Sequence, residues 1–185
     1  MAKTPTTYKE TKLGVLEIQE IEKIITENLA LVQKFIIRNV KKLEVNQATA
    51  KKLHQFLASN LFEQAGEYRK HDVELGEFKP PEYFKIPVLM KNWEDDFKER
   101  RKHIKNKEGH IETCAWLMHR LLWIHPFFDY NGRIARLLGE LYLIKNNLPI
   151  VDFRKVGRTN FVEAVKEATK TSSLEKFKSL IRKNL

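Results

Sequence analysis

The residues best suited to chemistry lie in one short stretch of the chain, residues 125–136, which reads His-Pro-Phe-Phe-Asp-Tyr-Asn-Gly-Arg-Ile-Ala-Arg. Apolar segments flank it on both sides, and both read as helices: 111–123 before it and 134–146 after it. The first backbone N–H groups of a helix have no partner within the helix, and the helix dipole favours negative charge there. A polar loop that leads into a helix therefore predicts an anion site.

Four residues in this loop and the helix start are suited to phosphate. Asn131 is a good N-cap residue, and Gly132 lets a phosphate approach the backbone closely. Arg133 and Arg136 are three residues apart, so they share one face of the helix, where both can bind phosphate oxygens.

Two more side chains add metal and proton chemistry. Asp129 is a hard oxygen ligand suited to Mg²⁺, which usually arrives already bridging nucleotide phosphates. His125 is the one side chain of the stretch whose ordinary pKa allows proton transfer near neutral pH. The residues alone thus predict a nucleotide-phosphate site with a general base beside it.

The same stretch closely resembles the signature of the Fic (filamentation induced by cAMP) domain family, His-x-Phe-x-Asp/Glu-Gly-Asn-Gly-Arg-x-x-Arg. The positions in register are His125, Phe127, Asp129, Asn131, Gly132, Arg133 and Arg136. Tyr130 stands where the family usually has glycine. So many fixed positions in so short a window make the resemblance specific.

A second stretch, residues 66–87, resembles the flap that borders the Fic active site. Gly66-Glu67-Tyr68-Arg69 is similar to the family's Gly-x-Tyr/Phe-Arg. Val73 and Leu75 alternate with charged residues, as do Phe84 and Ile86, so two short strands in a hairpin are predicted. In the family this flap is thought to align the target segment by strand pairing.

The resemblance implies a fold and a reaction. The fold is all-α: a single Fic-like domain over residues 1–185 with a short β-hairpin flap beside the active-site loop. The reaction is transfer of AMP from ATP to a Ser, Thr or Tyr hydroxyl of a target protein. His125 would be the general base, and Asp129 would hold Mg²⁺ on the phosphates. Asn131 with neighbouring backbone amides would hold the α-phosphate, and the two arginines would neutralise the departing pyrophosphate.

Other interpretations of the same residues stay open. Relatives that transfer the γ-phosphate usually carry lysine at the place of Gly132, so glycine favours AMP transfer. If the loop needs a positive φ at Tyr130, the tyrosine is strained by about 1 kcal/mol or more, and its ring would crowd the phosphates. The protein would then be a non-catalytic nucleotide-binding or interaction module. The alternative is an ordinary φ with the ring directed outward.

Three further points concern Phe127, the pKa of His125, and His119 in the preceding helix. Phe127 is assigned to packing, as the anchor of the loop in the core. The end of a helix tends to raise the pKa of a histidine, which would not help His125 as a base. His119 suggests an alternative, a metal site formed with His125 and Asp129. The two histidines are six residues apart, however, and this spacing does not place two side chains on one face of a helix.

Regulation is not encoded in a recognisable motif. Many Fic proteins are inhibited by a helix with Ser/Thr-x-x-x-Glu-Gly/Asn, and no segment of this chain completes that pattern. A separate inhibitory, antitoxin-like partner and a role as the toxin of a toxin–antitoxin pair are hypotheses that fit this gap.

The composition, 42% hydrophobic and 31% charged, suits one compact domain. The net charge of +10 is predicted to lie on solvated helix faces, since no RNP, zinc-finger or homeodomain pattern indicates nucleic acid. The one cysteine, Cys114, lies among apolar residues and suits a reducing compartment. Without a signal-peptide core or a run of roughly 20 apolar residues, a cytoplasmic protein with no membrane segment is expected.

Periodicity predicts the elements around the site. Residues 1–12 are expected to be loose, and Asn46 is expected to cap a helix. The remaining helices are predicted over 15–39, 89–101, 111–124 and 134–146, from 158 onward and over 172–184. The helix 111–124 is apolar around most of its girth and is therefore predicted to be the central buried one.

Overall fold

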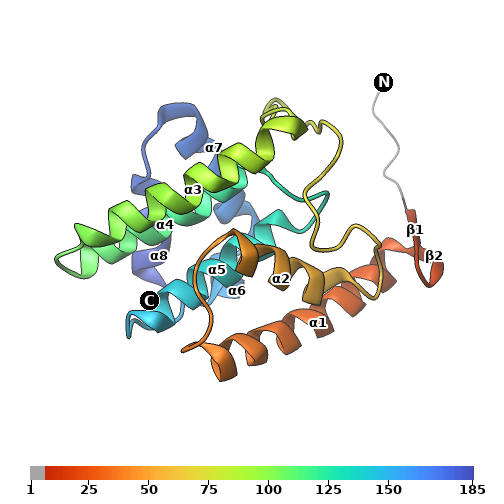
Figure 1. The fold of residues 1–185 in the computed structure, drawn as a ribbon, viewed down its shortest axis with the longest axis horizontal. Helices are drawn as coiled ribbons and strands as arrows, with labels where there is room; N and C mark the ends of the chain where they lie inside the picture. Colours follow the sequence, from red (N-terminus) through yellow and green to blue (C-terminus); the bar gives the residue numbers. More distant parts are fainter. Residues whose placement is uncertain (1–6) are drawn as a thin grey trace.

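The computed structural model describes residues 7–185, except for the side chain of Arg154. The chain is mainly helical, as predicted (Figure 1). The elements in chain order are β1 (Tyr8–Thr11), β2 (Gly14–Glu17), α1 (Ile18–Asn39), α2 (Gln47–Ala58), the short 3-10 helix η1 (Tyr83–Lys85), α3 (Ile86–Lys102), α4 (Lys107–Ile124), α5 (Asn131–Lys145), α6 (Phe153–Val156), α7 (Arg158–Thr171) and α8 (Glu175–Lys183).

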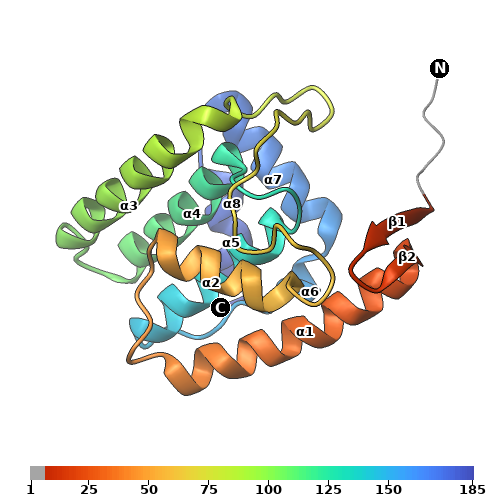
Figure 2. The same ribbon diagram turned by 45° about the vertical axis from the view of Figure 1, so that its right-hand side comes forward.

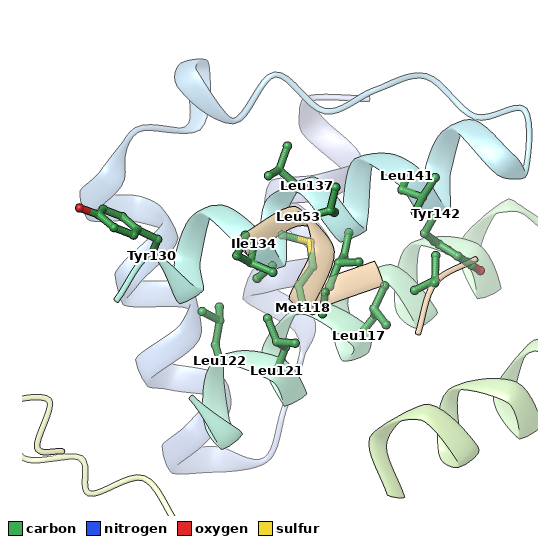
Figure 3. Close-up of a cluster of buried hydrophobic side chains, with 14 of the residues drawn as sticks. Leu53, Leu117, Met118, Leu121, Leu122, Tyr130, Ile134, Leu137, Leu141 and Tyr142 are labelled. Atoms are coloured by element: carbon green, nitrogen blue, oxygen red, sulfur yellow. The ribbon is translucent and has the colours of Figure 1, made fainter. Parts of the chain in front are cut away.

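Helices α4 and α5 form the centre of the molecule, and the other helices pack around them (Figures 1 and 2). Figure 3 shows Leu117 and Leu121 of α4 packed against side chains of α5, with Leu53 of α2 beside them. The central, buried helix predicted from its apolar girth is therefore confirmed. Gly139 permits this close packing, because a Cβ there would lie 2.6 Å from the Met118 sulfur.

Polar caps fix the starts of two helices. Asn46 accepts a hydrogen bond from the Thr49 N–H at 2.8 Å, which confirms the predicted cap of α2. Asn106 caps α4 in the same way, through the Gly109 N–H at 2.9 Å.

The β-structure is not where the sequence predicts it. Residues 1–6 lie outside the described part of the chain, but Tyr8–Thr11 forms β1, so the prediction of a loose segment is wrong there. β1 pairs antiparallel with β2, and this small hairpin stands at the start of α1 (Figure 2). The predicted helix from residue 15 accordingly begins only at Ile18.

The segment 66–87 does not contain the two predicted strands. Its ladder is a single bridge between Leu75 and Phe78, closed by the left-handed Gly76. Pro80 and Pro81 have no N–H to continue a ladder, and Pro87 favours the first turn of a helix. The predicted second strand is therefore replaced by η1 and the start of α3.

Two further differences concern helix boundaries. The short helix α6 was not predicted, and α5 begins at Asn131, three residues before the predicted start. Within residues 7–185, no helix is long and apolar enough to cross a membrane.

Candidate active site

The loop between α4 and α5 turns sharply at both ends. His125 ends α4 with φ 51°, and Tyr130 precedes α5 with φ 56°. A left-handed conformation costs a residue with a Cβ roughly 1–2 kcal/mol, so the loop is held in shape by its surroundings.

The ring of Tyr130 is buried, so the alternative of an ordinary φ with the ring directed outward is wrong. Its φ is positive, the conformation that the family's usual glycine would adopt freely. The ring lies against Phe62 and Phe128, with centroid separations of 6.2 and 6.3 Å. Figure 3 shows it directed away from the side chains packed between α4 and α5. The strain thus accompanies packing in an aromatic cluster.

Asn131 is not the N-cap that the sequence suggests. It is the first residue of α5 and is buried, with its side chain turned back into the loop. Its Oδ1 accepts from the Phe127 N–H at 2.9 Å, and its Nδ2 donates to the Phe127 carbonyl at 2.8 Å. The side chain therefore braces the loop, and the backbone at the start of α5 is left for an anion.

The start of α5 offers unpaired donors. Within residues 7–185, no hydrogen bond involves the backbone N–H of Asn131 or Gly132, as expected for a first helical turn. No atom would lie within 4 Å of a Cβ added at Gly132, so the space beside it is open. These features suit a phosphate oxygen.

His125 is held in the form that a general base needs. Its Nδ1 lies 3.4 Å from the Leu122 carbonyl, which can only accept, so the ring proton sits on Nδ1 and Nε2 is free to take another. Burial lowers its pKa from the ordinary 6.5 to about 4, outweighing the hydrogen bond to Leu122. The expectation that the helix end raises this pKa is therefore wrong, because desolvation dominates.

The two carboxylate oxygens of Asp129 have different partners. Oδ1 accepts from the Tyr130 N–H at 2.7 Å, and Oδ2 lies 3.3 Å from the ammonium of Lys9 on β1. Within residues 7–185, no three metal-ligating side chains come together. A Mg²⁺ ion held through one carboxylate, phosphates and water is compatible with this arrangement.

The two arginines line one cavity, as their spacing suggests. The cavity, of about 350 Å³, lies between α1, α5 and the segment 150–153. Arg133 forms an ion pair with Glu22 of α1, while its second terminal nitrogen is buried with no hydrogen-bond partner among the described residues. Arg136 donates from Nε to the Gly132 carbonyl at 3.0 Å and lies over the ring of Phe161.

Phe127 and His119 have structural surroundings. Phe127 is fully buried, with its ring stacked on that of His54 at 4.2 Å. His119 lies 3.1 Å from the Thr169 hydroxyl, a hydrogen bond that links α4 to α7.

Two residues hold the loop although the sequence analysis assigned neither of them a role in doing so. His54 of α2 contacts the Asp129 carbonyl at 3.3 Å. Arg69 is buried and donates from Nε to the His125 carbonyl at 2.8 Å, while its backbone N–H donates to the Pro126 carbonyl at 2.8 Å. Two sequence features could have indicated these roles: a histidine inside the apolar stripe of α2, and an arginine in the Gly-x-Tyr-Arg stretch.

The loop and its helices place the open backbone N–H groups of a helix start beside a neutral histidine, an arrangement that suits phosphate. The Fic/DOC family model matches residues 44–143, more than half of the chain, and the chain belongs to this family. The Fic-type helical fold predicted from the signature is thereby confirmed.

The curated relatives include two proteins named protein adenylyltransferase Fic. That of Drosophila willistoni is 31% identical over 164 residues, which cover 86% of this chain and 32% of that protein. That of Drosophila virilis is 31% identical over 168 residues, which cover 86% and 33%. The chain thus spans about a third of the length of these relatives.

Solved structures show the same fold. BepC from Bartonella tribocorum, with bound AMPPNP, superposes with a TM-score of 0.77 at 18% identity, covering 100% of this chain and 94% of that one. The N-terminal Fic domain of a Bartonella quintana protein, with bound ADP, gives a TM-score of 0.79 at 18% identity, covering 100% and 92%.

Proposed function

We propose that this chain is a magnesium-dependent protein adenylyltransferase that moves AMP from ATP to a Ser, Thr or Tyr hydroxyl of a target protein. Relatives at about 31% identity carry that activity in their names, and a protein of the same fold holds the ATP analogue AMPPNP. The observation that carries the proposal is a neutral His125, with Nε2 free, at the end of a loop whose other end offers unpaired N–H groups.

The proposed reaction is one displacement at the α-phosphorus. His125 takes the proton of the target hydroxyl on Nε2, and the hydroxyl oxygen forms a bond to the α-phosphorus. The bond from that phosphorus to the bridging oxygen breaks, and the electron pair leaves with pyrophosphate. The proton on His125 then passes to solvent or to the leaving group.

The other residues stabilise the charges of this step. The N–H groups of Asn131 and Gly132 face the non-bridging oxygens of the α-phosphate, where negative charge builds. Arg133 and Arg136 neutralise the pyrophosphate. Asp129 would hold Mg²⁺, which would supply charge neutralisation on the phosphates.

The test uses ATP labelled at the α- or the γ-phosphate, Mg²⁺ and a cell lysate. The α label is expected in a protein band with the wild type and to fall by at least about 100-fold with His125→Ala. Calorimetry with ATP and circular dichroism serve as controls that the variant still binds nucleotide and is folded. Label from γ-labelled ATP alone would mean phosphoryl transfer, and ATP binding without any label would mean a non-catalytic module.

The inhibitory partner, the toxin–antitoxin role and the cytoplasmic location stay predictions from the sequence. A partner would be sought by co-purification. An inhibitory protein found in this way is expected to reduce transfer of the α label when it is added back to the assay.

A further inference from the structure

His54 is a fully buried histidine that no step of the proposed reaction uses. It lies in the middle of α2, and its ring stacks on Phe127 at 4.2 Å, nearly parallel at 7°. A buried polar ring is stable only when its nitrogens are hydrogen-bonded, so the partners of both nitrogens define its role.

Those partners fix the tautomer of His54. The Gly66 backbone N–H can only donate, and it lies 2.8 Å from Nδ1, so Nδ1 accepts. The proton of the neutral ring is therefore on Nε2, which donates to the Asp129 carbonyl at 3.3 Å. The ring thus connects segment 66–69 with the α4–α5 loop.

The peptide group between Asp129 and Tyr130 receives this hydrogen bond. Its carbonyl is held by His54, with the Asn131 amide as a second, longer donor at 3.4 Å. Its N–H, which belongs to Tyr130, donates to Oδ1 of the Asp129 side chain at 2.7 Å. Because a peptide group is planar, holding the carbonyl also aims the N–H. The aimed N–H fixes Oδ1 and leaves Oδ2 for charged partners, a place taken here by the Lys9 ammonium at 3.3 Å.

The other end of the connection is equally constrained. Gly66 has φ +88° and lies so close to α2 that a Cβ there would be 2.9 Å from that of Gln55. Three residues later, Arg69 binds the carbonyls of His125 and Pro126. His54 and Arg69 therefore connect segment 66–69 to both ends of the α4–α5 loop.

We infer that His54 is a positioning residue that aims the Asp129 carboxylate, and hence the metal, through the 129–130 peptide. This inference rests on the metal role proposed for Asp129. Partners that orient metal ligands in this indirect way typically change metal affinity or activity by about 10–100-fold when they are removed.

Two substitutions separate the two hydrogen bonds of His54. In His54→Asn the amide reaches only the place of Nδ1, so it can still accept from Gly66 but cannot reach Asp129. In His54→Gln the amide reaches the place of Nε2, so it can still donate to Asp129. Each variant loses one of the two buried hydrogen bonds, so both should unfold at similar denaturant concentrations.

ATP affinity is measured by calorimetry on the full chain at increasing Mg²⁺ concentrations. The quantity compared is the Mg²⁺ concentration at which half of the gain in ATP affinity is reached. His54→Gln is expected within about threefold of the wild type, and His54→Asn is expected to need at least about 10-fold more Mg²⁺. Equal Mg²⁺ requirements in the two variants would overturn the inference. So would a wild type whose ATP affinity does not respond to Mg²⁺.

The adenylyl transfer assay keeps this result separate from the proposed function. A wild type that binds Mg²⁺ and ATP but labels no protein contradicts the proposed reaction, while the two variants still decide the role of His54.

Discussion

The two sides of the α4–α5 loop are held by different kinds of contact. On the side of α2 and segment 66–69, His54 and Arg69 bind backbone carbonyls with side chains that are buried. On the side of the β1–β2 hairpin and α1, ion pairs of partly exposed side chains reach the loop and the start of α5: Lys9 to Asp129 and Glu22 to Arg133.

The buried hydrogen bonds are costly to break, whereas the exposed ion pairs can be replaced by other charged groups. A buried hydrogen bond that is broken leaves a polar group without water, which costs about 1–3 kcal/mol. An exposed ion pair contributes about 1 kcal/mol or less, so the charges of a ligand can replace it. The buried side thus fixes the shape of the loop, while the exposed side neutralises its charges with ion pairs that a charged ligand can replace.

The largest expected effect is on the buried side, at Arg69. Arg69→Met leaves the carbonyls of His125, His71 and Pro81 without this donor. The free energy of unfolding should fall by about 3–5 kcal/mol, measured by urea denaturation. Lys70→Met, the exposed neighbour, is the control and should change it by at most about 0.5 kcal/mol. Equal losses in both variants would remove the distinction between the two sides.

The next effect is the pH dependence that burial gives to His125. Its pKa is lowered from 6.5 to about 4, so the unfolded chain binds a proton that the folded chain does not over that range. The stabilisation is complete above pH 6.5 and is lost as pH falls toward 4. At pH 4.5 the wild type should have lost about 2 kcal/mol more than His125→Asn, relative to pH 7. Parallel pH curves for the two proteins would contradict the buried, neutral imidazole.

A smaller effect isolates the strain at Tyr130. Both Tyr130→Ala and Tyr130→Gly lose the ring that packs on Phe62 and Phe128, and both should be less stable than the wild type. Only glycine adopts the positive φ without strain, so Tyr130→Gly should be more stable than Tyr130→Ala by about 1 kcal/mol. Thermal unfolding compares them, and a more stable alanine variant would mean that the loop relaxes.

The smallest effect on stability is expected on the exposed side, at Glu22. Glu22→Gln frees Arg133, so unfolding should change by at most about 1 kcal/mol while ATP affinity rises by up to about fivefold. Glu27→Gln, an exposed change on the same helix, is the matched control for charge. An unchanged ATP affinity, or a rise equal to that of the control, would show that this ion pair does not compete with phosphate.

The sequence predicted the framework well because hydrophobic periodicity reports burial directly. The girth of α4 and the cap at Asn46 both agree with the structure. The prediction of a hairpin in 66–87 was wrong because the alternation there is too short to specify strands. Its prolines favoured an irregular segment followed by η1 and the first turn of α3.

Within the site, the side chains of the 125–136 signature were predicted but their conformations were not. The positive φ of Tyr130 and the inward turn of Asn131 depend on contacts with residues far away in the chain. For the same reason, the pattern in 125–136 does not include His54 and Arg69. Their roles arise only when α2 and segment 66–69 pack beneath the loop.

On this proposal the α4–α5 loop is a preformed phosphate site. Its buried hydrogen bonds stay in place when a nucleotide binds, while its exposed ion pairs are replaced. A crystal structure with Mg²⁺ and a non-hydrolysable ATP analogue tests it most directly. We predict α-phosphate oxygens at the N–H groups of Asn131 and Gly132, Arg133 released from Glu22, and the bonds of His54 and Arg69 unchanged. A nucleotide bound elsewhere, or a loop that rearranges around Tyr130 to admit it, would contradict the account.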